Sequence, residues 1–260
     1  MSSEFPTEVR IKLSYNWVMV HSQVTVVTLP SALPEELSDA KRQRWFEVCL
    51  VLKVACGGAF FNALDILKNG PSAASQMTNA RWSFGIIQEV TALFLLGYVL
   101  SRRGLRFKYL GLGYSLRDIG VGLLVTGISL IAYLLGSTVV QLFHYELYCS
   151  FAVGPTGSTF FRHPSAMAVP FCLVNPFFEE LIVRAYLMTE VLELTGSPIL
   201  AVALSVAVQS SYHLYYGWTG ALSLSFQFLV FAFYYVRSRR ALPVIVAHGL
   251  LDVYSLIRLW

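Results

Sequence analysis

Seven apolar stretches, each about as long as a membrane-crossing helix, follow one another through most of this chain of 260 residues. They cover residues 45–67, 84–100, 119–143, 166–194, 198–216, 218–236 and 241–259. About 20 residues of helix cross the roughly 30 Å of hydrocarbon in a bilayer. A segment in hydrocarbon must be helical, because each backbone amide needs a hydrogen-bond partner within its own segment. The pattern therefore predicts an all-α, polytopic transmembrane helical bundle with about seven membrane helices.

The composition agrees with a membrane protein and excludes an ordinary soluble domain. Hydrophobic residues make up 56% of the chain and charged residues only 13%, whereas soluble domains contain about 25% charged residues. The mean hydropathy is +0.60. We expect a polar N-terminal extension over residues 1–44 and one transmembrane domain over residues 45–260.

The net charge of +4 comes from short basic clusters that adjoin apolar stretches, at residues 41–44, 102–108 and 237–240. Such clusters are typical of the cytosolic flanks of membrane helices. With seven crossings, all three clusters fall on the same side as the N-terminus. We therefore expect a cytosolic N-terminus and no nucleic-acid partner.

The fourth apolar stretch carries charges that are costly inside a membrane, by about 2.5–3.5 kcal/mol each on insertion scales. Glu180 and Arg184 are four residues apart and share a helix face, so they can form an ion pair. Glu179 lies about 100° around the helix, in the same row as Asn175. A structural ion pair explains Glu180 and Arg184 but not the second glutamate. Glu179 is therefore the candidate for chemistry.

Two later stretches add His213, His248 and Asp252. The spacing of His248 and Asp252 places them on one helix face, where the carboxylate can accept a hydrogen bond from the ring. A hydrogen bond that packs helices together is the better explanation of His213 alone, and it explains the pair of His248 and Asp252 equally well. Taken together, they suit a water molecule activated by a carboxylate or by a metal. Two histidines with carboxylates also suit zinc.

These motifs resemble those of the CPBP family, which includes type II CAAX prenyl endopeptidases and bacterial abortive-infection proteins. The resemblance rests on Glu-Glu-x-x-x-Arg at residues 179–184, a histidine in the next helix, and His-x-x-x-Asp at residues 248–252. It spans about residues 80–260, with the motifs confined to residues 175–252. Two positions depart from the family pattern: Gln209 stands where phenylalanine is usual, and Asp252 stands where asparagine is frequent.

The resemblance implies that Glu179 and His213 activate the attacking water. It assigns Glu180, His248 and Asp252 to the catalytic group, and Arg184 and Asn175 to structural support. The family is described both as metalloproteases and as metal-free glutamate peptidases. A zinc ion held by Glu179, His213 and His248 and a metal-free mechanism therefore both stay open. An ionised Asp252 only accepts hydrogen bonds, so it would orient His248, bind a metal or carry a proton.

The sequence thus predicts an intramembrane endopeptidase, a hydrolase that cleaves a peptide bond near the membrane surface. Its expected partners are membrane lipid and a protein or peptide substrate, including a membrane-anchored one. The resemblance implies the inner membrane of a bacterial cell as its location. The alternative is a catalytically silent membrane protein, such as a partner-binding or bacteriocin-immunity protein. A proton-coupled transporter is less favoured, because the sequence shows no paired half-helices.

Overall fold

A computed structural model describes residues 33–70, 78–143 and 166–257 of the chain. Contacts divide the chain into two units, Met1–Ala40 and Lys41–Trp260. Most of the predicted N-terminal extension lies outside the described residues, so its boundary with the transmembrane domain stays a prediction. The helical bundle belongs to the second unit.

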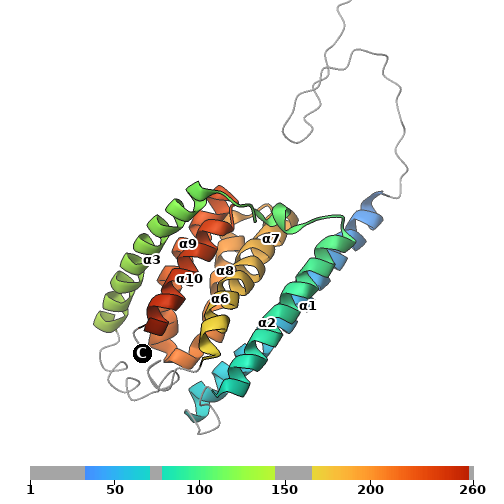
Figure 1. Cartoon of the computed structure of the whole chain (residues 1–260). Coiled ribbons are helices and arrows are strands. Elements are labelled where there is room, and N and C mark those ends of the chain that lie inside the picture. Colours follow the sequence, from blue (N-terminus) through green and yellow to red (C-terminus); the bar gives the residue numbers. More distant parts are fainter. Residues whose placement is uncertain (1–32, 71–77, 144–165, 258–260) are drawn as a thin grey trace, which may run out of the picture. The chain divides into compact units, whose positions relative to one another are not determined.

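Each of the seven apolar stretches contains helix, and no strand occurs in the described ranges. Figure 1 shows the helices in chain order. They are α1 (Leu33–Asn69), α2 (Asn79–Arg102), α3 (Leu116–Phe143), α6 (Ala168–Glu179), α7 (Leu187–Thr195), α8 (Pro198–Tyr212), α9 (Gly217–Ser238) and α10 (Leu242–Ile257). Short 3-10 turns, η2 (Phe107–Leu110) and η4 (Leu214–Tyr216), precede α3 and α9. A π-helix, η3 (Glu180–Tyr186), joins α6 to α7.

Four helical segments are long and apolar enough to cross a membrane: Ser38–Asn69, Asn79–Arg102, Leu116–Phe143 and Leu214–Ser238. Apolar side chains are exposed along α3, as expected for a helix surface that contacts lipid. Exposed examples are Leu123, Leu124, Ile131, Leu134 and Leu135. The predicted helical membrane bundle is confirmed.

The helices described in the fifth and seventh stretches are shorter than a membrane crossing requires. Helix α8 has 15 residues and α10 has 16, which at 1.5 Å per residue is about 22–24 Å, less than the roughly 30 Å of hydrocarbon. Helix α8 ends because His213 leaves the helical conformation and the chain turns through η4 to Gly217, whose φ is 78°. This early end places His213 at a helix terminus.

Small residues let α3 approach its neighbours α9 and α10 closely, as is common between membrane helices. A Cβ atom at Gly122 would lie 2.7 Å from Val246 Cγ1 of α10. A Cβ atom at Gly136 would overlap the ring of Phe226 of α9. The face formed by α3, α9 and α10 is therefore packed through glycine.

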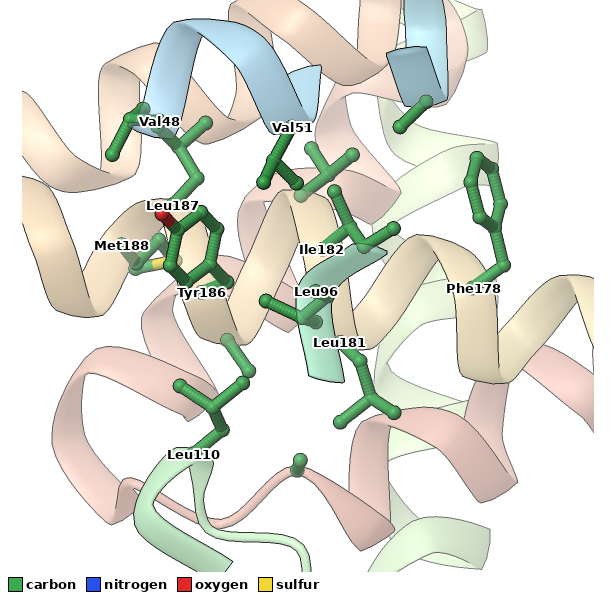
Figure 2. Close-up of a cluster of buried hydrophobic side chains, with 14 of the residues drawn as sticks. Val48, Val51, Leu96, Leu110, Phe178, Leu181, Ile182, Tyr186, Leu187 and Met188 are labelled. Atoms are coloured by element: carbon green, nitrogen blue, oxygen red, sulfur yellow. The ribbon is translucent and has the colours of Figure 1, made fainter. Parts of the chain in front are cut away.

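The fourth stretch lies at the centre of the largest hydrophobic cluster. All seven residues of η3 are buried, including the charged Glu180 and Arg184. Figure 2 shows Leu181, Ile182 and Tyr186 of η3 in this cluster, together with Val51 of α1 and Leu96 of α2. The helix that carries the candidate catalytic residues is thus enclosed by protein.

Candidate active site

Glu179 and Glu180 occupy the junction between α6 and the π-helix η3. Pro176 lies inside α6, three residues before Glu179, and proline removes a backbone hydrogen bond from a helix. In η3 the wider π-helical turn replaces the α-helical one, and single turns of this kind are frequent at functional sites. Both glutamates are buried, with 5% and 0% of their surface exposed.

Glu180 uses both of its carboxylate oxygens within the protein. Its Oε2 accepts a hydrogen bond from Arg184 Nε at 3.2 Å, and its Oε1 lies 2.9 Å from His248 Nδ1. The predicted pairing of Glu180 with Arg184 is therefore present. The same carboxylate also fixes the orientation of the His248 ring. This contact joins the fourth stretch to α10.

Arg184 connects this ion pair to α8. Its Nη1 donates to Ser205 Oγ at 2.7 Å, and its Nη2 donates to Gln209 Oε1. Ser205 in turn donates to the carbonyl oxygen of Val183 at 2.8 Å. Arg184 is fully buried, so its charge is stabilised by Glu180 and these two neutral acceptors.

Gln209 provides the link that the sequence reading missed. Its Nε2 donates to Glu179 Oε2 at 2.7 Å while its Oε1 accepts from Arg184. Ser205, Gln209 and His213 are spaced four residues apart, which puts them on one face of a helix. That spacing was the available signal, but the sequence reading treated Gln209 only as a departure from the family pattern. In the structure Gln209 orients Glu179 and separates it from the arginine.

Asn175 lies four residues before Glu179 in α6, and its side chain links this helix to α10. Its Nδ2 donates to Asp252 Oδ2 at 3.2 Å. The other oxygen, Asp252 Oδ1, lies 3.6 Å from His248 Nε2, which is beyond normal hydrogen-bond length. The Asp252 side chain is 23% exposed, compared with 8% for His248. Asp252 therefore lies at the more open edge of the network.

His213 adjoins the network through the backbone. Its Nδ1 lies 2.8 Å from the carbonyl oxygen of Gln209, and its ring packs against Tyr212, Tyr216 and Phe228. The Glu179 carboxylate is close enough to interact electrostatically with the ring. Among the described residues, His213 Nε2 has no hydrogen-bond partner, so this nitrogen can face a water or a substrate.

The three residues suggested for zinc do not form a ligand cluster in this structure. Among the residues that the structure describes, no three His, Cys, Asp or Glu side chains are grouped so as to hold a metal ion. His248 has a carboxylate beside each ring nitrogen. The donor arrangement therefore does not fit the suggested zinc site, and the choice between a zinc-dependent and a metal-free mechanism is left to experiment.

A cavity of about 480 Å³ lies between α8 and α9, beside this network. It is lined mainly by small and apolar side chains, including Ser210, Leu214 and Trp218. No member of the hydrogen-bonded network lines it, although Leu214 directly follows His213. The cavity therefore does not mark the position of the candidate chemistry.

A second buried charge network lies about ten residues further along the same continuous helix. Glu190 is completely buried and accepts from Arg44 at 2.8 Å and from Arg103 at 2.6 Å. Glu193 accepts from Arg44 at 2.7 Å and from the Tyr109 hydroxyl. Burial, followed by the hydrogen bond to Glu193, raises the pKa of Tyr109 well above its usual value, so this hydroxyl stays a donor. We name these five residues the arginine network.

Comparison with known proteins identifies the region that contains the candidate site. Residues 161–254 match the family model of type II CAAX prenyl endopeptidases, described as Rce1-like. A search of curated proteins found no match, and neither did a search of solved structures. The matched residues include every candidate catalytic residue, and the resemblance to the CPBP family is confirmed over this region.

Proposed function

Because residues 161–254 carry a domain like that of type II CAAX prenyl endopeptidases, we propose that this chain is an intramembrane endopeptidase that cleaves a peptide bond near the membrane surface. One observation carries the proposal within the matched region. Glu179 is buried and accepts a hydrogen bond from an amide, whereas its neighbour Glu180 is paired with Arg184. A buried carboxylate without a bonded cation is suited to take a proton from water.

In the proposed mechanism Glu179 and His213 activate the attacking water. Gln209 holds Glu179 Oε2, which leaves Oε1 to accept a proton from the water. His213 is fixed through Nδ1, so its Nε2 can orient the same water. As the water oxygen attacks the substrate carbonyl, its proton passes to Glu179.

His248 is proposed to stabilise the oxyanion of the tetrahedral intermediate. Glu180 holds the ring through Nδ1, and Nε2 points toward the more open edge beside Asp252. A preoriented donor at that position lowers the barrier because it needs no rearrangement when charge develops. Asp252, held by Asn175, lies 3.6 Å from Nε2, close enough for its carboxyl to attract the ring N–H. No step of this mechanism uses a metal.

We further propose that the end carrying the arginine network faces the cytosol. Basic residues from the three clusters meet there: Arg44 and Arg103 bind Glu190, and Arg239 donates to Thr189 one residue earlier. This gathering supports a cytosolic N-terminus. The proposed substrates are proteins or peptides anchored in or near the bilayer of a bacterial inner membrane.

The test is cleavage by purified protein in lipid vesicles, using fluorescence-quenched peptides with and without a lipid anchor. Glu179→Gln should reduce the cleavage rate by about 1,000-fold, within the range for loss of a general base. Glu193→Gln, on the same continuous helix but in the arginine network, is the matched control and should retain activity. Wild-type cleavage by Glu179→Gln would refute the role of Glu179 as the base, whereas no cleavage by the wild type itself would favour the catalytically silent alternative.

A further inference from the structure

Glu89 of α2 is a buried carboxylate that the proposed mechanism has not used. It lies within the second apolar stretch and is 5% exposed. Its Oε2 is buried and has no hydrogen-bond partner among the residues that the structure describes. A buried polar atom without a partner is rare in proteins and calls for an explanation such as a ligand or a catalytic role. In a membrane helix the cost of keeping such a group is greater still.

The packing of α2 on α6 brings Glu89 to the level of the active site. Near the start of both helices the Trp82 and Phe171 rings are 4.8 Å apart, and a Cβ atom at Gly85 would lie 3.0 Å from the Phe171 ring. Glu89 lies one helical turn beyond Gly85 on α2, and Asn175 lies one turn beyond Phe171 on α6.

Helices α2 and α6 run in the same direction beyond Glu89 and Asn175. Further along them, Leu96 of α2 and Leu181 of η3 belong to one buried cluster, as Figure 2 shows. Glu89 therefore lies beside the segment from Asn175 to Glu179. In agreement, its carboxyl interacts electrostatically with Glu179, Asp252 and His248.

The charges around Glu89 favour its neutral form. Arg184 is bound to Glu180, and His248 lies between Glu180 and Asp252. Within the described part of the chain, neither of these two cations is bound to Glu89, and Glu89 Oε2 lacks even the amide donor that Glu179 Oε2 has. Neighbouring carboxyl groups do not all ionise together in a low-dielectric site. A neutral carboxyl can donate a hydrogen bond or a proton, which a carboxylate cannot.

We propose that Glu89 is a further catalytic residue, the general acid that protonates the leaving amine. The proposal rests on the proposed peptidase function. Glu179 takes one proton from water while the water oxygen bonds to the carbonyl carbon. When the C–N bond breaks, the Glu89 hydroxyl gives its proton to the departing nitrogen. The proton held by Glu179 then returns to Glu89 through water, which restores both groups.

The experiment compares two substrates of the same sequence, one with a peptide bond and one with an activated ester at the cleavage site. An activated ester expels a stable leaving group and needs little protonation. Glu89→Gln keeps the size and polarity of the side chain but removes the acid. We expect it to lower kcat on the peptide about 100-fold, and on the ester by about tenfold at most. Glu179→Gln should lower both rates by similar factors.

Equal losses on peptide and ester in Glu89→Gln would overturn the proposal and indicate a structural role, as would an unchanged peptide rate. Infrared difference spectra of wild type and Glu89→Gln provide a second measurement that needs no substrate. The wild type should show a protonated carboxyl band that the variant lacks, and its absence would also overturn the proposal. A wild type that cleaves neither substrate would refute the peptidase function, and with it the role of Glu89.

Discussion

Glu180 and Glu190 are both completely buried, and each is held by two basic residues, but their surroundings differ. In the arginine network, Arg44 and Arg103 face Glu190 and Glu193, so the charges match. Around Glu180, Arg184 and His248 are accompanied by three further carboxyl groups: Glu179, Asp252 and Glu89.

The difference separates two uses of buried charge. A network in which each carboxylate has its own cation is suited to joining helices, and a stable ion pair of this kind has no proton to exchange. A network with surplus carboxyl groups can hold and move protons. The excess of carboxyl groups, rather than the presence of ion pairs, distinguishes the candidate active site from the arginine network.

The largest effect on stability is expected from Arg184→Met. The substitution leaves Glu180 buried beside other carboxyl groups without its arginine, which should lower the free energy of unfolding by about 3–5 kcal/mol. Chemical unfolding in detergent would measure the loss. A variant as stable as the wild type would show that the active-site network does not depend on this cation. Arg103→Met is the matched change, and it should cost less because Arg44 still binds Glu190.

A smaller effect is expected from Gln209→Leu, which removes the link between Arg184 and Glu179. The variant should fold, but the misplaced Glu179 should lower kcat by about 100-fold. The measurement is cleavage rate per folded molecule, with the folded fraction determined by size-exclusion chromatography. Full activity in Gln209→Leu would mean that Glu179 is positioned by some other contact.

Unlike Gln209→Leu, Glu190→Gln should lower stability while leaving activity nearly unchanged. Loss of one charge in the arginine network should lower stability by about 1–3 kcal/mol, moderated by the partial exposure of Arg44 and Arg103. Activity per folded molecule should stay within about threefold of wild type, because the network holds no reacting group. If Glu190→Gln lost activity as completely as Glu179→Gln, the contrast between the two networks would fail.

The smallest effect is expected from metal removal. Since the histidines and carboxylates of the described residues do not form a donor cluster, dialysis against a chelator should change the cleavage rate by less than about twofold, whereas catalytic zinc is required for turnover. Metal analysis of the same active preparation checks the result. Stoichiometric zinc, with activity lost on chelation and restored on zinc addition, would instead favour the metalloprotease mechanism.

Much of the fold was predictable because lipid imposes simple requirements on a chain. Apolar length was enough to predict the helical bundle, and a spacing of four was enough to pair Glu180 with Arg184. The partner of Glu179 was not predictable, because Gln209 reaches it from another helix. The role of Asn175 was not predictable either. Residue spacing within one helix does not show that Asp252 of α10 lies within hydrogen-bond reach of Asn175.

The π-helix makes the fourth stretch sensitive to its residue count as well as to its residue types. An α-helix turns about 100° per residue, and a π-helical turn holds about one residue more than an α-helical turn. Side chains after η3 are therefore rotated relative to the face on which α6 presents Asn175. Because the π-helical turn already accommodates an extra residue, inserting one more residue within 181–186 would turn Glu190 away from Arg44 and Arg103, even though every named side chain would still be present.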